Sequence, residues 1–247
     1  MIKILSLIFL ILLILVGRTR GLKTFVVFYL SIFLIMLYLT FIRLGLNAII
    51  LAIITCILAA STILFILNGY NVKTKSSFIS IMFVLIFVLL ITMFIGKTAN
   101  IRGFSIESIE SIGYYSHDIN YDMTNVIIGM YLICTIGTII DTSISISSAM
   151  YEIYRNNKKI SSHELYKSGM NVGKDILSTT INTLFFAVVS SFIGFFMWFY
   201  CVSFNFWSVS KSFEQNVIQL LLCFIASVMI IPLTSYISSK MIIKDSK

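Results

Sequence analysis

Long apolar runs separated by short polar segments follow one another along the whole chain. A helix needs about 20 mostly apolar residues to cross a bilayer. Runs of this kind predict seven membrane helices, at Ile2–Val16, Leu22–Ile42, Leu44–Leu67, Phe78–Ile95, Met123–Met150, Ile176–Tyr200 and Val217–Ser238. The first run is short for a span. Because only GRTRG follows it and no small-residue cleavage site, it is interpreted as a retained helix and not as a signal peptide.

Composition supports the same fold class. Of the 247 residues, 59% are hydrophobic and 11% are charged, whereas a soluble domain carries about a quarter charged residues. No run alternates apolar and polar residues over about ten positions, as strands of a membrane β-barrel do. The sequence therefore predicts an all-α polytopic protein of the cell (plasma) membrane.

Basic residues between the spans predict the orientation, because basic loops stay in the cytoplasm. Thirteen of the 18 lysines and arginines fall in one set of loops, which places the N-terminus outside and the C-terminus inside. Residues 1–21 then form an N-terminal helix with a basic turn, and residues 22–247 form a six-helix domain with an extracellular loop at 96–122. The loops are too short to form a folded basic surface, so no nucleic-acid partner is expected.

Asp141 lies about two-thirds of the way along the fifth predicted span. An ionised carboxylate at the bilayer centre costs about 2.5–3.5 kcal/mol even on the lenient insertion scale, so we expect it to be sheltered. It belongs to a polar stripe with three- and four-residue spacing, the repeat of one helix face. The stripe comprises Thr138, Asp141, Thr142, Ser145, Ser148 and Glu152.

The next span begins with a matching polar face. Its residues are Asp175, Thr179, Asn182 and Thr183, with Lys174 alongside. Burial of two neighbouring polar stripes against each other costs the least free energy in a membrane. Small residues would allow the helix backbones to approach closely. The candidates for this role are Gly137, Ser145, Gly169 and Gly173.

The chemistry of these stripes has two interpretations. Serine, threonine and Asn182 can simply hydrogen-bond neighbouring helices, and Asp141 can be a permanently protonated structural acid. A titratable group is not needed for helix packing, however, so we favour a role for Asp141 in binding a proton or Na⁺. The cysteines lie in or beside spans without metal-binding spacing, and are predicted to be small core residues. They are Cys56, Cys134, Cys201 and Cys223.

Several stretches resemble the YibE/F-like family of bacterial membrane proteins. They are GRTRGLK (17–23), IIDTSISISSAMYEI (139–153) and KSGMNVGKDILSTTINTLFFA (167–187). More distantly, the order of G-x-x-x-D, a basic loop and a threonine-rich span is similar to SecD/SecF and RND-type membrane domains. That resemblance implies a six-helix core of this plan in which Asp141 is the coupling residue. Lys174 and Asp175 match a basic position that opens the next helix, and Thr179, Thr180 and Thr183 fall among its threonines.

Those pumps carry a large external domain between their first two core helices, and here the corresponding spans are nearly continuous. We therefore expect a short subunit that pairs with a longer YibE/F-like paralogue, or with further copies of itself, in the lipid bilayer. The favoured function is a transport-related subunit coupled to H⁺ or Na⁺, without another cofactor or a bound metal. The alternative is a non-transporting assembly or scaffold subunit. No catalytic constellation is present, so no enzymatic activity is expected.

Overall fold

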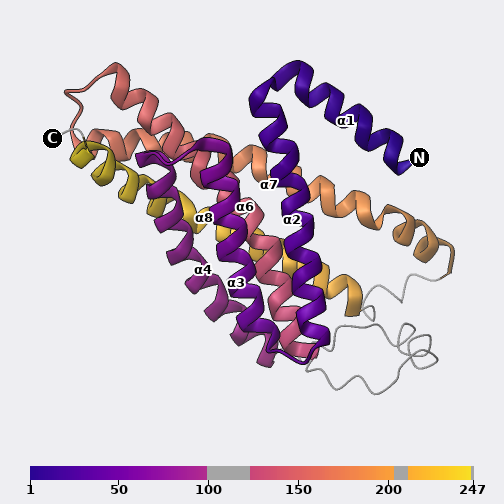
Figure 1. Ribbon diagram of the computed structural model, residues 1–247. Helices are drawn as coiled ribbons and strands as arrows, with labels where there is room; N and C mark the ends of the chain where they lie inside the picture. The colour runs from indigo at the N-terminus through magenta and orange to yellow at the C-terminus, as the bar shows by residue number, and fades with distance from the viewer. Residues whose placement is uncertain (99–122, 203–210, 246–247) are drawn as a thin grey trace.

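The computed structural model describes residues 1–98, 123–202 and 211–245, and every regular element in these ranges is helical (Figure 1). The elements are α1 (Ile2–Gly17), α2 (Thr19–Arg43), α3 (Ala48–Ser61), a short π-helix η1 (Thr62–Ile66), α4 (Val72–Thr98), α6 (Met123–Asn156), α7 (Ser162–Val202) and α8 (Lys211–Asp245). The predicted all-α fold is confirmed. Nearly all of the predicted external loop at 96–122 lies outside the described residues.

Six segments are long and apolar enough to cross a membrane: α2, α3 together with η1, α4, α6, α7 and α8. The first predicted span, Ile2–Val16, corresponds to α1, which is a helix of only 16 residues. At 1.5 Å per residue it measures about 24 Å, less than the hydrocarbon core of about 30 Å. The expectation of about seven membrane helices, the first of them short for a span, is thus matched by six candidate spans and one shorter apolar helix in the described chain.

The turn between α1 and α2 is unusually tight. Arg18 adopts a left-handed φ of 47° and its backbone N–H bonds to the Ile14 carbonyl. A Cβ on Gly21 would collide with the Leu13 backbone, so only glycine fits where the two helices meet. Phe9 of α1 then packs on Phe28 of α2, with ring centroids 5.9 Å apart.

The third helix begins later than predicted, at Ala48. Gly45 has a φ of +83°, which ends the preceding helix, and the Asn47 side chain accepts a hydrogen bond of 3.0 Å from the Ile49 N–H. Asparagine is a preferred N-cap because it satisfies one of the free amides of the first turn. The predicted run from Leu44 was continuous in hydropathy, and this local capping chemistry divides it.

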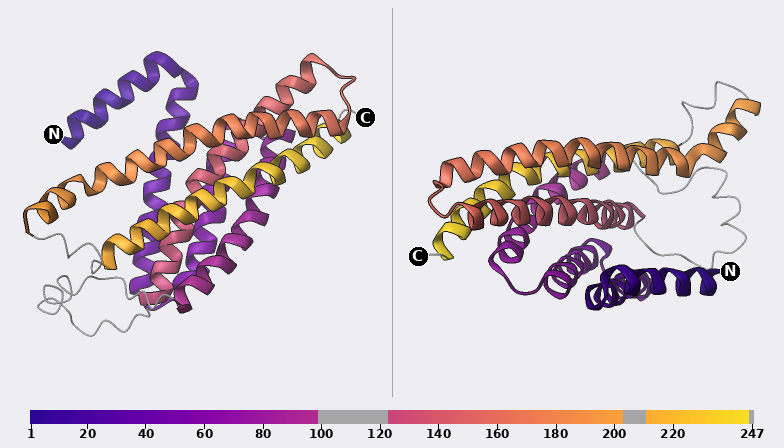
Figure 2. Two further views of the ribbon diagram at one scale, coloured as in Figure 1. Left: turned by 180° about the vertical axis from the view of Figure 1, so that it is seen from behind. Right: turned by 90° about the horizontal axis from the view of Figure 1, so that it is seen from above.

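The bundle is arranged around α6. Seen from above, α7 lies along one edge and the α1–α2 pair along the opposite edge, with α6 between them (Figure 2). Helices α4, α6 and α8 pack against one another, while α3 joins α6 to α2. The main core lies between these elements and includes Leu64, Ile81, Ile139, Ile146 and Ile230, each at most 1% exposed.

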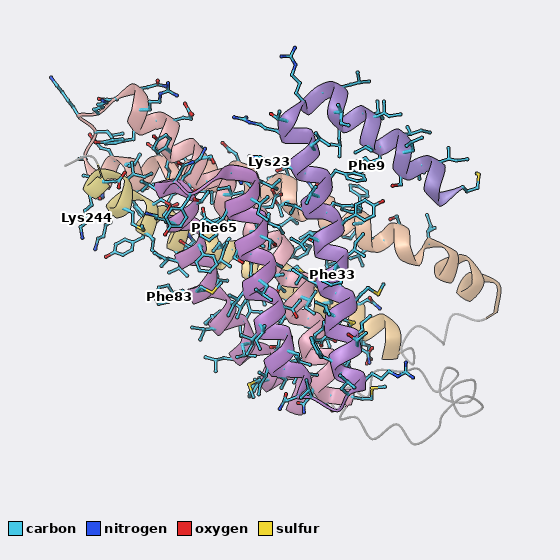
Figure 3. All side chains as sticks on the ribbon, viewed as in Figure 1. Phe9, Lys23, Phe33, Phe65, Phe83 and Lys244 are labelled. Atoms are coloured by element: carbon cyan, nitrogen blue, oxygen red, sulfur yellow. The ribbon has the colours of Figure 1, made fainter. Side chains whose placement is uncertain are left out.

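Large apolar side chains cover the outside of the bundle. Phe33 on α2 and Phe83 on α4 are both 57% exposed, and the side chains project from the outer helices (Figure 3). Such a surface is stable in lipid and not in water. The exposed apolar surface agrees with a multi-pass membrane protein.

Candidate functional site

Asp141 lies near the middle of the 34-residue helix α6, and its side chain is exposed. No hydrogen bond or ion pair to it is found within the described part of the chain. Gly137, one turn earlier on the same face, is also exposed, and a Cβ added there would meet nothing within 4 Å. The prediction that this chain shelters the carboxylate is therefore wrong.

The other residues of the α6 stripe have quite different surroundings. Thr142 is buried, with 1% of its surface exposed, while Thr138, Ser145 and Ser148 are half-buried. A three- and four-residue repeat covers about a third of a helix's circumference, so its two margins can face different neighbours. Asp141 and Thr142 lie on opposite margins, which is why only one of them is covered.

The matching stripe on α7 is uncovered as well. Lys174, Asp175, Thr179, Asn182 and Thr183 are all exposed. The Thr179 hydroxyl donates to the Ile176 carbonyl and the Thr183 hydroxyl donates to the Thr179 carbonyl, each at 2.9 Å. The hydroxyls thus satisfy themselves on their own helix, and the predicted mutual burial of the two stripes does not occur in the single chain.

Helix α7 instead packs through two of its glycines, Gly169 and Gly173. A Cβ on Gly169 would lie 2.5 Å from Met150 Sδ and 2.9 Å from Ser235 Oγ, and one on Gly173 would collide with Ile231. The predicted close approach is confirmed at both glycines, whereas Gly137 makes none. Only 6% of the most apolar segment of α7 is buried, compared with 50% for α6. The rest of α7 leaves a polar face open.

An apolar cavity of about 140 Å³ lies between α2, α3 and α6, and Gly137 is part of its lining. The two hydroxyls in it, Ser31 and Thr55, donate to the carbonyls of Val27 and Leu51 in their own helices at 2.9 and 2.8 Å. Both hydroxyls are thus used as donors within their own helices, and Asp141 is not among the residues that line the cavity.

Sequence reasoning missed a network of buried hydroxyls between α4, α6 and α8. Three hydroxyl pairs join these helices: Ser77 with Ser147 at 2.6 Å, Ser143 with Thr234 at 3.1 Å, and Ser76 with Ser238 at 3.0 Å. All six side chains are fully buried. The signal was present in the polar repeats KSSFIS and TSYISS (75–80 and 234–239), which lie near the ends of predicted spans.

Three buried hydroxyls lack a partner within the described residues: Tyr38 Oη, Thr142 Oγ1 and Ser235 Oγ. Ser235 lies beside Gly169, and Thr142 lies one turn before Ile146, whose Cδ1 would be 3.3 Å from a Cβ on Gly173. Thr142 and Ser235 are therefore on the side of α6 and α8 that α7 covers. The candidate residue Thr142 thus lies on the covered margin of the stripe, whereas Asp141 lies on the open margin.

A second missed feature is a pair of thiols between α6 and α8. Cys134 Sγ lies 3.6 Å from Cys223 Sγ, and Gln219 Nε2 donates to Cys134 Sγ at 2.8 Å. The prediction of small core cysteines is confirmed for Cys56, which is fully buried. It is incomplete for the pair, because Cys134 is only half-buried and has a polar partner. The side chain of Cys201 lies outside the described part.

The carboxylate is therefore the chemically distinctive group on the open side of α6, and the described residues contain no cluster of three or more histidine, cysteine or acidic side chains. Comparison with known proteins gives one family: residues 5–244 match the YibE/F-like protein family. No match was found among curated proteins or among solved structures. Since the match covers nearly the whole chain, the protein belongs to the YibE/F-like family.

Proposed function

We propose that this protein is a transport-related subunit of a membrane complex and that Asp141 binds the coupling cation, a proton or Na⁺. The observation that carries the proposal is an uncovered carboxylate near the middle of α6. Ionisable side chains within spans are rare and mark ion pathways or relays, because an unpaired charge in lipid is costly. A protonated carboxyl group tolerates lipid, and an ionised one needs a cation or a polar neighbour. Gain and loss of a cation would therefore change what can lie against this face.

We propose that a partner completes the site. The open side of Asp141 and the open polar face of α7 both require cover in a bilayer, and polar groups on a second membrane subunit would provide it. A longer YibE/F-like paralogue would supply that subunit in a hetero-oligomer, and a second copy of this chain would do so in a homo-oligomer. Lys174, Asp175, Thr179, Asn182 and Thr183 would then act at the subunit interface and not against Asp141 of the same chain.

The orientation in this proposal follows the basic residues. The loop between α6 and α7 and the end of α8 would face the cytoplasm. An external N-terminus requires α1 to cross the membrane, and with 16 residues it would need local thinning of the bilayer to do so. The SecD/SecF-like plan of the six longer helices also stays a prediction. The coupling role that this plan implies for Asp141 belongs to the same prediction.

A scaffold role is the second candidate, and a specific observation favours it. The hydroxyl network between α4, α6 and α8 holds three helices together without any titratable group. If the exposed polar faces serve only to bind partner helices, then Asp141 acts as a hydrogen-bonding group and its charge is irrelevant.

The two functions differ in their response to Asp141→Asn, which keeps size and hydrogen bonding but removes titration. The experiment compares growth of cells that carry Asp141→Asn, Asp175→Asn or the unchanged protein as their sole copy, over a series of pH values and Na⁺ concentrations. Coupling predicts a growth defect for Asp141→Asn that varies with pH or Na⁺, although the variant is produced and assembled normally. Growth equal to that of the unchanged protein under every condition would reject coupling and leave the scaffold role.

A further inference from the structure

We infer that Cys134 and Cys223 form a binding site for a soft monovalent metal cation such as Cu⁺ or Ag⁺ between α6 and α8. The two sulfurs are 3.6 Å apart and come from neighbouring helices. Gln219 lies one turn before Cys223 and directs its amide N–H at Cys134 Sγ. Thr138 lies one turn after Cys134 on the same helix. Three side chains on two helices therefore converge on one point.

The spacing of the sulfurs suits a shared metal ion. Metal–sulfur bonds of about 2.3 Å hold two sulfurs about 3.8 Å apart at a tetrahedral angle, and about 4.6 Å apart in the linear arrangement that two-coordinate monovalent ions prefer. The two sulfurs, 3.6 Å apart, therefore need to separate by about 1 Å to reach the linear geometry. Cys134 is half-buried, so its side chain has room to rotate toward a wider angle. A disulfide would instead require an S–S distance near 2.05 Å and an oxidant.

The donor set favours a soft monovalent ion over zinc. Thiolate sulfur selects soft metals such as Cu⁺, and d¹⁰ monovalent ions accept two sulfur ligands. Zinc takes four ligands, and here only an amide and a hydroxyl oxygen could complete such a set. The acidic residues of α6, Asp141 and Glu152, lie about two or more helical turns from Cys134.

Charge balance supports the same ion class. The cation displaces the thiol proton of Cys134, bonds to that sulfur, and takes a lone pair from the Cys223 thiol. The proton leaves to water, and no electrons are transferred. One cation and one thiolate leave no net charge, which limits the desolvation penalty inside the bilayer. The Gln219 N–H lies against the sulfur that carries the negative charge.

Cys56 provides an internal comparison. It is fully buried on α3 beside the apolar cavity, and no second described cysteine lies against it. A thiol that only fills space in the core has this environment. The Cys134–Cys223 pair differs through its sulfur–sulfur contact, its amide donor and the partial exposure of one member. The site does not depend on Asp141, so it stands or fails independently of the proposed coupling.

The test titrates the full-length protein in lipid nanodiscs with Ag⁺ in chloride-free buffer, with native mass spectrometry for stoichiometry and calorimetry for affinity. The variant Cys56→Ala/Cys201→Ala keeps only the pair and is expected to bind one Ag⁺ per chain. Addition of Cys134→Ala or Cys223→Ala should weaken binding by at least about 100-fold. Gln219→Ala should weaken it by about 10- to 100-fold, as loss of a ligand's hydrogen-bonding neighbour commonly does.

A measurement on the unaltered protein guards against variants that misfold. Peptide mapping after alkylation should show that one equivalent of Ag⁺ protects Cys134 and Cys223 together, with no change in the reactivity of Cys56. X-ray absorption spectroscopy at the silver edge should show two sulfur atoms bound to the Ag⁺ ion. The inference is overturned if the pair-only variant binds no Ag⁺ more tightly than the variant without the pair, if Zn²⁺ binds more tightly than Ag⁺, or if the pair gains no protection.

Discussion

Ser77 of α4 and Ser147 of α6 are 70 residues apart in the chain, and their hydroxyl oxygens lie 2.6 Å apart in the buried interface. Ser77 also donates to the Ser143 carbonyl at 3.2 Å. Hydroxyl pairs of this kind hold membrane helices in register, because each group would otherwise be unsatisfied in an apolar medium. The register of α4 against α6 thus depends on serine side chains and not on apolar packing alone.

Ser77→Ala and Ser147→Ala should each lower the free energy of unfolding by about 0.6–1.7 kcal/mol, the range measured for hydrogen bonds between membrane helices. The double variant should lose less than the sum, since both changes remove one shared bond. Unfolding in mixed micelles measures the free energy of unfolding of the two single variants and of the double variant. Ser190→Ala, on an exposed part of α7, is the control and should change stability by less than about 0.5 kcal/mol. Strict additivity of the two changes would show that the pair is not coupled.

Gly169 and Gly173 should reject any larger side chain. Gly173→Ala forces a Cβ into Ile231, and Gly169→Ala places one against Met150 and Ser235, so overpacking should destabilise each variant by about 1–3 kcal/mol. Gly137→Ala is the matched control. Its Cβ would be free, and alanine favours a helix by up to about 1 kcal/mol over glycine. Melting temperatures should therefore fall for the first two variants and stay equal or rise for the third. A uniform response at all three positions would contradict the packing of α7.

Much of the fold follows from hydropathy, because a run of 20 apolar residues has few structures open to it in lipid. Hydropathy does not locate local breaks, and so the start of α3 at Ala48 depends on Gly45 and the Asn47 cap. It also gives no information about which neighbour covers a helix face. Asp141 and Thr142 are adjacent in sequence, yet one is exposed and the other buried, since only the three-dimensional placement of α7 and α8 decides between them.

The start of α7 is fixed by a reciprocal pair of hydrogen bonds. The Ser161 N–H donates to Glu164 Oε2 at 3.0 Å, and the Glu164 N–H donates to Ser161 Oγ at 3.3 Å. Ser161→Ala removes the cap of the first turn and should destabilise it by about 1 kcal/mol. Hydrogen exchange of the amides at 162–165 should accelerate accordingly. Ser168→Ala removes only a hydroxyl bonded to the Glu164 carbonyl. Faster exchange in that variant, or none in Ser161→Ala, would contradict the cap.

The open polar face of α7 should mediate subunit contact. Asn182→Leu removes an exposed amide that has hydrogen-bonding capacity in lipid, and should dissociate the complex recovered by gentle purification, because such amides are satisfied across helices. Phe185→Leu, an exposed apolar change one turn away, should leave the complex intact. Mass measurement of the purified particles compares the two. A monomer in both the unchanged protein and the Asn182→Leu variant would contradict a subunit interface on this face.

The most direct measurement is an infrared difference titration of Asp141 in lipid nanodiscs. A protonated carboxylic acid has a carbonyl band separate from that of a carboxylate, so the spectra report the protonation of this side chain directly. We predict a carbonyl band that changes with pH, is altered by Na⁺ if Na⁺ is the coupling ion, disappears in Asp141→Asn and persists in Asp175→Asn. A spectrum in which no pH-dependent band is lost with Asp141 would contradict cation binding at this residue.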